Sequence, residues 1–375
     1  MKISIPLRAF HNYGGISRCI WELSKNYSHS HEVHIFSSQF ESPPFKVSHH
    51  PVFSFSSPPF LAELSFAINS QKALDSFFSD IVYSPATACY KADVFTANSC
   101  HKAAVELFSQ QRGHMYSFLK ALEPKSRIVI EIEKRNYQQD NYQKITAISK
   151  RTKEELMQYY NVPADDIVVI YPGVDTDIFK PSTKSRILIR KKYSIPANIP
   201  ILLFCGHEFK RKGLAQLITA LAKVKRDWRL IVIGGDKKDY YENLARKHKI
   251  LDKILFLGFV KSLADVFNGS DVFVFPTTYE PYGMVITEAL SSGLPVVTSK
   301  IAGAAELMTH GKEGFLLDDP FDILGISEYI DTLLADEKLR KRMGKYARNT
   351  ATKYNWKKIS MQMMSVFEKV INEKR

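Results

Sequence analysis

The chain has 375 residues and 45% hydrophobic content, enough for two domains with full apolar cores. No apolar run approaches the roughly 20 residues of a membrane-spanning helix, and the opening MKISIPLRAF lacks the apolar segment and cleavage site of a signal peptide. Four scattered cysteines without CxxC spacing argue against disulfide or metal roles and fit a reducing cytoplasm.

The formal net charge is +13 and the pI is about 9.3. Such an excess favours an anionic partner, such as a phosphorylated glycolipid or the anionic surface of a membrane. Nucleic acid is the weaker candidate, because the sequence contains no zinc finger, RNP-like aromatic motif or other recognisable nucleic-acid module. We therefore expect a cytoplasmic protein, with peripheral association at the inner face of the plasma membrane as a further option.

In the first half, short apolar runs alternate with helical patterns, which predicts a parallel α/β sheet. Gly14 and Gly15 stand between the first expected strand and a helix, as a loop that lets a ligand approach the backbone or as a plain tight turn. His101 follows the strand expected over residues 93–97 and begins a helix, a position where open α/β sheets bind ligands. Asn98 is a rival for this role, and a generic histidine at a helix start is the alternative.

Two further segments of the first half are candidates for contact with an acceptor or a membrane. Residues 43–60 are rich in Pro, Ser, His and Phe, which predicts an irregular connection with at most one edge strand. Residues 102–137 form a basic and aromatic helical region, typical either of a membrane interface or of a solvated helical face. The aromatic and basic residues in these segments include Phe53, Phe55, Phe60, Lys102, Tyr116, Phe118 and Lys120.

The motif Pro172-Gly173-Val174-Asp175 interrupts the pattern, and we place the domain boundary here, between residues 1–172 and 173–354. The second sheet begins at residues 200–205 and continues into GHEFKRKG. Arg211 and Lys212 then lie beside a helix that we expect to begin near Gly213. Two cations at that place would neutralise a leaving diphosphate, whereas the alternative is an ordinary basic loop.

The segment FVFPTTYEPYGMVITEALSSGLPVVT predicts a buried strand, an acidic loop with Glu280, a helix from about Gly283, and a second strand. The helix carries Glu288 on its second turn. Its first backbone N–H groups, at Gly283, Met284 and Val285, form a site for an anion such as a diphosphate. An acidic side chain beside such a site would address sugar hydroxyls or a developing cation. The alternative is that both glutamates are solvated.

The spacing Glu280-(seven residues)-Glu288 within EPYGMVITEALSSGLPVV resembles the paired-glutamate signature of the GT-B glycosyltransferases of family 4. The members of that family are retaining, metal-independent enzymes that use nucleotide-sugar donors, and the resemblance implies the same activity for this chain. It implies an α/β fold of two Rossmann-like domains facing a cleft, with residues 355–375 forming a helix that crosses back to the first domain. It places Glu280 by the donor sugar and Glu288 at the ribose hydroxyls.

The same resemblance assigns roles to other positions. It implies that His101 orients the donor sugar, that Gly14 and Gly15 lie against the donor phosphate and the acceptor, and that the backbone near Phe259 and Val260 reads the nucleobase. Lys212 matches a lysine of the family pattern. His207 stands where the family has an arginine, so we expect Arg211 to substitute for it.

We therefore predict a hexosyltransferase without metal or cofactor. Its donor is expected to be a UDP-sugar, with GDP-mannose as the second choice. Its acceptor is expected to be a cell-envelope glycan such as a lipopolysaccharide core, on family analogy and basic charge. The alternatives are a nucleotide-sugar 2-epimerase, a synthase with a soluble acceptor, and a non-catalytic protein that binds anionic surfaces.

Overall fold

The computed structural model describes residues 1–112 and 123–374. The chain forms two compact units, one of Met1–Pro172 with Trp356–Arg375 and the other of Gly173–Asn355. Tyr116, Phe118 and Lys120 of the expected interfacial region lie outside the described residues. Within the described ranges, no helix combines the length and the apolar character needed to cross a membrane.

The first unit is built on a sheet of seven parallel strands in the order β5-β3-β1-β6-β7-β8-β9. The central strands are buried along nearly their whole length, as expected for a parallel sheet covered by helices on both faces. Its strands are β1 (Lys2–Pro6), β3 (Glu32–Ser37), β5 (Ser48–Pro51), β6 (Ile81–Pro85), β7 (Val94–Ala97), β8 (Lys144–Ala147) and β9 (Ile167–Val169), and β2 (Ala9–Phe10) pairs with β4 (Gln39–Phe40) in a separate ribbon.

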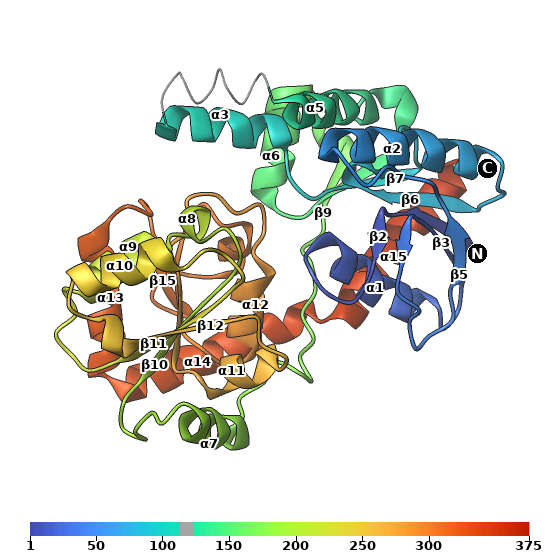
Figure 1. The fold of residues 1–375 in the computed structure, drawn as a ribbon. Helices are drawn as coiled ribbons and strands as arrows, with labels where there is room; N and C mark the ends of the chain where they lie inside the picture. Colours follow the sequence, from blue (N-terminus) through green and yellow to red (C-terminus); the bar gives the residue numbers. More distant parts are fainter. Residues whose placement is uncertain (113–122, 375) are drawn as a thin grey trace. The chain divides into compact units, whose positions relative to one another are not determined.

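Helices cover this sheet in two groups (Figure 1). In one group α1 packs against α15, and in the other α5 contacts both α2 and α3. The second group shares one apolar core with the strands, which includes Phe66, Phe95 and Tyr137. The helices are α1 (Ile16–Tyr27), α2 (Pro59–Asp75), α3 (His101–Arg112), α5 (Pro124–Asn136), α6 (Lys150–Tyr160) and α15 (Trp356–Lys374).

The segment expected to be an irregular connection, residues 43–60, contains the edge strand β5 and the first residues of α2. Phe53 and Phe55 are exposed and pack edge to face with their ring centroids 5.1 Å apart, whereas Phe60 is partly buried. Isolated exposed apolar residues are common on soluble proteins, so this pair does not by itself identify a membrane or acceptor contact.

The second unit contains six parallel strands in the order β12-β11-β10-β13-β14-β15. Helix α9 contacts α10 and α13, whereas α7 packs on α11 and α12 on α14 (Figure 1). The strands are β10 (Ile201–Cys205), β11 (Arg229–Ile233), β12 (Ile254–Gly258), β13 (Val272–Phe275), β14 (Val296–Ser299) and β15 (Gly314–Leu317). The helices are α7 (Thr183–Lys192), α8 (Phe209–Lys212), α9 (Leu214–Leu221), α10 (Asp239–Lys247), α11 (Leu263–Gly269), α12 (Met284–Ser291), α13 (Ile323–Ala335) and α14 (Glu337–Ala351).

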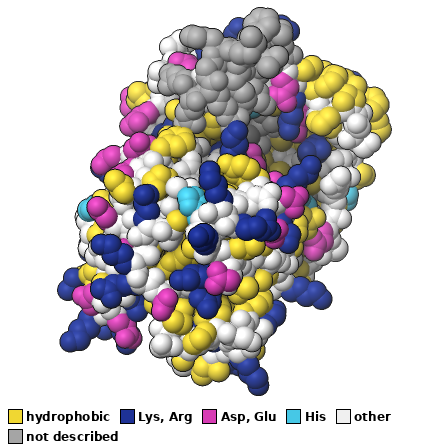
Figure 2. Space-filling model, turned by 60° about the vertical axis from the view of Figure 1, so that its left-hand side comes forward, with side chains coloured by type: hydrophobic (Ala, Val, Ile, Leu, Met, Phe, Trp, Pro, Cys, Tyr) yellow, Lys and Arg dark blue, Asp and Glu magenta, His cyan; other side chains and the backbone are white. Residues whose placement is uncertain are grey.

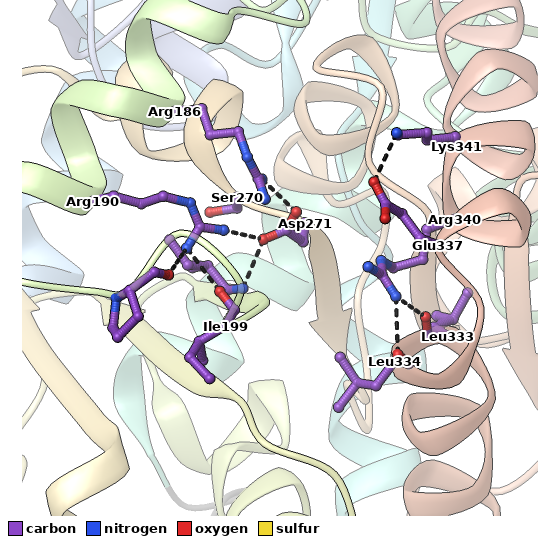
Figure 3. Close-up of polar contacts among 12 residues, drawn as sticks. Arg186, Arg190, Ile199, Ser270, Asp271, Leu333, Leu334, Glu337, Arg340 and Lys341 are labelled. Carbon is purple, nitrogen blue, oxygen red and sulfur yellow. Dashed lines mark hydrogen bonds and ion pairs between the residues drawn. The ribbon is translucent and has the colours of Figure 1, made fainter.

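Asp271 ties α7 to the start of two strands of this sheet (Figure 3). Its carboxylate pairs with Arg186, accepts a hydrogen bond from Arg190 Nη2 at 2.8 Å, and accepts another from the backbone N–H of Ile201 at 2.8 Å. Arg190 also donates to the carbonyl of Ile199 at 2.7 Å. Asp271 thus holds the first residues of β10 and β13 in place. Strand β13 leads directly into the loop that carries Glu280.

Candidate functional site

A glycine, Gly283, determines the backbone conformation at the end of the loop between β13 and α12. Gly283 has a φ of +95° and caps α12, so a side chain is disfavoured there. A Cβ at this position would lie 3.0 Å from Cγ of Glu280 and 3.1 Å from Cδ1 of Ile286. The helix starts at Met284, as predicted, and its first turn is closed by a bond from Ile286 N to Gly283 O at 2.9 Å. Glu280 therefore lies directly beside the N-terminus of α12.

Both glutamates of the pair are buried, so the alternative that they are solvated is wrong. Glu280 is 9% exposed and Glu288 is 2% exposed. The Glu280 carboxylate forms an ion pair with Lys212 and lies 3.7 Å from Nη1 of Arg211. Its backbone carbonyl accepts a hydrogen bond from Gly303 N at 3.0 Å, which holds the loop in place.

Arg211 and Lys212 end the short helix α8, where the sequence predicted a loop. Gly213, with a φ of +84°, joins α8 to α9 and lies against the backbone of Pro276, because a Cβ there would fall 2.0 Å from the Pro276 carbonyl oxygen. This close approach brings the two cations beside the Glu280 loop. The amide of Thr278 donates to the carbonyl of Arg211 at 2.9 Å and joins the segments further.

The guanidinium of Arg211 is held at a defined orientation. Its Nε and Nη2 donate to one oxygen of Glu208 at 3.0 and 2.5 Å, and its Nη1 donates to the carbonyl of Tyr279 at 2.7 Å. The sequence interpretation missed Glu208. The sequence did contain an indication of this contact, because Glu208 lies three positions before Arg211. That spacing brings two side chains together on a helical turn.

Lys212 is buried, and its Nζ lies 5.2 Å from the ring centroid of Phe275. Burial, followed by the neighbouring Arg211 guanidinium, lowers the pKa of Lys212 to about 7, while the Glu208 carboxylate acts in the opposite direction. A bound anion would stabilise the charged form of Lys212, because it would replace the favourable interactions with water that burial removes. The residue is thus suited to bind a diphosphate.

His207 lies at a different place from this ionic cluster. Its ring is 5.1 Å from that of Phe259, and its Nδ1 accepts a weak bond from Gly235 N at 3.3 Å. Phe259 is 79% exposed, and Val260 is partly buried. Arg211, and not His207, therefore lies near Lys212 and Glu280, and its substitution for the arginine of the family pattern stays a prediction.

The other candidate residues lie in the first unit. The amide of His101 opens α3 and donates to both oxygens of Glu133 at 3.2 and 3.0 Å. Glu133 is 3% exposed and also accepts from the Tyr160 hydroxyl at 2.6 Å. Burial raises the pKa of Glu133 to about 7, although both hydrogen bonds oppose the shift. The sequence interpretation did not identify Glu133, which fixes the backbone at His101.

Gly14 and Gly15 are exposed and lie immediately before α1, with Gly14 at a φ of +79° and Gly15 as the cap of the helix. A Cβ at Gly15 would meet nothing within 4 Å. Asn98 follows β7, and its amide donates to the carbonyl of Thr96 at 3.3 Å. The proposed contacts of Gly14, Gly15 and Asn98 with the donor stay predictions. Among the described residues, no group of three His, Cys, Asp or Glu side chains could hold a metal ion, and metal independence also stays a prediction.

Lys and Arg side chains are spread over the face that Figure 2 shows, with Asp and Glu interspersed. The charge excess of +13 is therefore not gathered into one patch on this face. It supports attraction of anionic partners in general but does not identify one docking surface.

Two family models match successive parts of the chain: Glycosyltransferase Family 4 matches residues 13–178, and Glycosyl transferases group 1 matches residues 185–350. An uncharacterized glycosyltransferase of Methanocaldococcus jannaschii is 31% identical over 60% of this chain and 59% of that protein, so the chain spans less than two thirds of this relative. The lipopolysaccharide glucosyltransferase WaaG of Escherichia coli is 26% identical over 68% of each chain.

Solved structures show the same fold. The crystal structure of WaaG has a TM-score of 0.83 at 21% identity and covers 97% of this chain and 99% of its own. HepE of Anabaena, in complex with UDP and glucose, has a TM-score of 0.73 at 21% identity and covers 98% and 100%. The predicted α/β fold of GT-B type, with parallel sheets in two Rossmann-like units, is confirmed. The chain belongs to the GT-B glycosyltransferases of family 4.

Proposed function

We propose that this protein transfers a hexose, with retained configuration, from a UDP-sugar to a glycan of the cell envelope. The observation that carries the proposal is the ionic cluster of Lys212, Arg211 and Glu280 at the N-terminus of α12. Two cations and a helix N-terminus suit a diphosphate, and a buried carboxylate beside them suits the sugar that the diphosphate carries.

The chemistry of the reaction assigns a role to each group. As the glycosidic bond to the diphosphate breaks, the sugar gains oxocarbenium character and negative charge develops on the diphosphate. Lys212, Arg211 and the first amides of α12, at Gly283 to Val285, stabilise that negative charge. Glu280 positions the sugar and stabilises its cationic centre, and Glu288 binds the ribose hydroxyls. The family resemblance assigns to His101 the role of orienting the sugar. This chemistry requires no metal or cofactor.

The choice of donor and acceptor is supported by the comparisons. HepE was crystallised with UDP and glucose, and WaaG is a lipopolysaccharide glucosyltransferase. The net charge of +13 favours an acceptor that carries phosphate or lies at an anionic surface. We therefore propose UDP-glucose as the first donor to test and a lipopolysaccharide-core type glycan as the acceptor. In this proposal the protein works in the cytoplasm, at the inner face of the plasma membrane.

The test is a transfer assay with UDP-glucose, UDP-galactose and GDP-mannose against a deacylated lipopolysaccharide-core oligosaccharide, with and without EDTA. We expect one UDP-sugar to give a glycosylated product and free UDP, with the anomeric configuration of the donor and no loss in EDTA. The reaction without acceptor is run in parallel. A donor that changes into its C2 epimer under those conditions would show a 2-epimerase, and turnover with GDP-mannose alone would replace the UDP-sugar assignment.

A further inference from the structure

A polar groove lies within the first unit between α3 and α6. Strands β7 and β8, which precede these helices, are neighbours in the sheet, so both helices begin at its carboxyl edge, and they contact each other (Figure 1). Open α/β sheets bind their ligands at that edge. The volume of the groove is about 240 Å³, somewhat below the roughly 300–1,000 Å³ of sites for drug-sized ligands, so it suits a single ring. None of the residues assigned above to donor binding lines it.

The polar side chains of the groove come from α6, and two of them are held by an ion pair. Arg151 Nε donates to Oε1 of Glu155 at 2.8 Å, and the Glu155 side chain is only 9% exposed. Glu154 and Gln158 also line the groove and are exposed. Carboxylate oxygens accept hydrogen bonds, a guanidinium donates them, and an amide does both. This mixture suits the hydroxyl groups of a sugar, because each hydroxyl can both donate and accept.

Tyr159 supplies an aromatic ring whose position is set by α3. Lys102 and Glu106 lie one helical turn apart on α3, and both reach this ring. Nζ of Lys102 is 5.7 Å from the ring centroid, and the Tyr159 hydroxyl donates to the Glu106 carboxylate. Together with Ala103 and Leu107 of α3, the ring gives the groove an apolar part that can contact the C–H groups of a sugar.

We propose that this groove holds a neutral hexose ring of the acceptor glycan, an inference that rests on the transfer reaction proposed above. An anionic ring is disfavoured, because the lining carries two carboxylates against one guanidinium and would repel an added negative charge. A purely apolar ligand would remove water from the carboxylates and the amide without replacing its hydrogen bonds. Any phosphate of the acceptor, which the net charge of +13 favours, would therefore lie on another part of that molecule.

The first test uses the methyl glycosides of glucose, galactose and mannose as probes and the ¹³C-labelled methyl groups of Ala103 and Leu107 in the full chain as the readout. We expect at least one glycoside to shift both signals, assigned with Ala103→Ser and Leu107→Ile, until they saturate. The signals of Ala220 and Leu217, buried in the second unit, should not move. The uronic acid form of the same glycoside, which adds a carboxylate at C6, should bind more weakly by about tenfold or more. Unchanged signals of Ala103 and Leu107 with all three glycosides, or an equal response to the uronic acid, would overturn the proposal.

The second test uses variants at the two exposed polar positions. Gln158→Ala and Glu154→Ala should each raise the Kd of the bound glycoside by about three- to tenfold, the effect of one lost hydrogen bond. Gln362→Ala, at an exposed position of α15, is the matched control and should leave it unchanged. A Kd that stays the same in Gln158→Ala and Glu154→Ala would show that the sugar binds elsewhere and overturn the proposal.

The transfer assay separates this inference from the proposed function. Gln158→Ala should raise the KM for the acceptor, whereas kcat and the KM for UDP-glucose should stay as in the wild type. Normal transfer with an unchanged acceptor KM in Gln158→Ala would overturn the groove as an acceptor site and leave the proposed function intact. Saturable glycoside binding in the groove, without transfer from any nucleotide sugar, would support the groove as a sugar site and contradict the proposed function.

Discussion

The ammonium of Lys212 pairs with the carboxylate of Glu280, although β11, β12 and β13 separate the two residues along the chain. The contact exists because Gly213 lets α8 approach the backbone of Pro276 closely. In the proposed reaction both side chains have another partner, since Lys212 binds the diphosphate and Glu280 the sugar. Donor binding must therefore exchange this ion pair for two new contacts, and that exchange has measurable consequences.

The first consequence is that donor affinity depends on pH. Because the pKa of free Lys212 is lowered to about 7, a diphosphate that binds its charged form must take up a proton at higher pH. We expect the Kd for UDP-glucose to be nearly constant below pH 7 and to rise by up to about tenfold per pH unit above it. Isothermal titration calorimetry between pH 6 and 9 measures this change.

Lys212→Arg is the control for that titration. The guanidinium stays charged throughout the range, so the variant should show a flat Kd even if its absolute affinity differs. Equal pH dependence in the wild type and in Lys212→Arg would show that another group takes up the proton.

The second prediction concerns Glu280. In Glu280→Gln the ion pair with Lys212 is lost, so free UDP should bind three- to tenfold more tightly, because the diphosphate no longer competes with a carboxylate. Glycosyl transfer should fall by at least about 100-fold, since the charge that stabilises the sugar cation is gone. Glu328→Gln, a change at an exposed position of α13, should alter neither quantity. Unchanged turnover in Glu280→Gln would remove Glu280 from the reaction.

The third prediction concerns Glu133 and stability. Its folded-state pKa of about 7 lies above that of an unfolded glutamate, so the folded protein binds the proton more tightly. The free energy of unfolding should therefore fall as pH rises from 5 to 8, by up to about 3 kcal/mol from this residue. Glu133→Gln should remove most of that fall in urea unfolding, whereas Glu131→Gln, at an exposed position of the same helix, should retain it. Parallel pH curves for all three proteins would contradict the assignment.

The fourth prediction compares two carboxylates that Figure 3 shows together. Asp271→Ala leaves the buried Arg190 without its carboxylate counter-charge and should destabilise the protein by about 3–5 kcal/mol. Glu337→Ala breaks only the pair with Lys341, in which both side chains are mostly exposed, and should leave the free energy of unfolding nearly unchanged. Denaturant unfolding of the two variants measures the difference. Similar losses for both would show that Asp271 does not hold α7 on the sheet.

Much of the fold was predictable from periodicity and stop signals. The strands over residues 93–97 and 200–205, the buried strand before Pro276 and the helix start after Gly283 were all predicted at or near their observed bounds. The Ser149 side chain accepts from Thr152 N at 3.1 Å and caps α6, a position at which serine is favoured. These features are local, since they depend on residues within a few positions of one another.

The features that sequence reasoning missed depend on contacts between distant segments or on very short elements. Helix α8 has four residues, too few to show a helical period, and was predicted as a loop. The contact between Glu133 and the amide of His101, and that between Arg211 and the carbonyl of Tyr279, join segments that only the tertiary fold brings together. The ion pair that occupies Glu280 was missed for the same reason.

The central claim is that the second unit binds a nucleotide sugar through α12 and its two glutamates. A thermal-shift titration with UDP-glucose, UDP-galactose, GDP-mannose and ADP-glucose tests it most directly, because a ligand that binds the folded state raises the melting temperature. We predict a saturable rise with the UDP-sugars, and in Glu288→Ala a rise that requires at least tenfold more ligand. Melting temperatures that no nucleotide sugar changes, with the wild type folded, would contradict the claim.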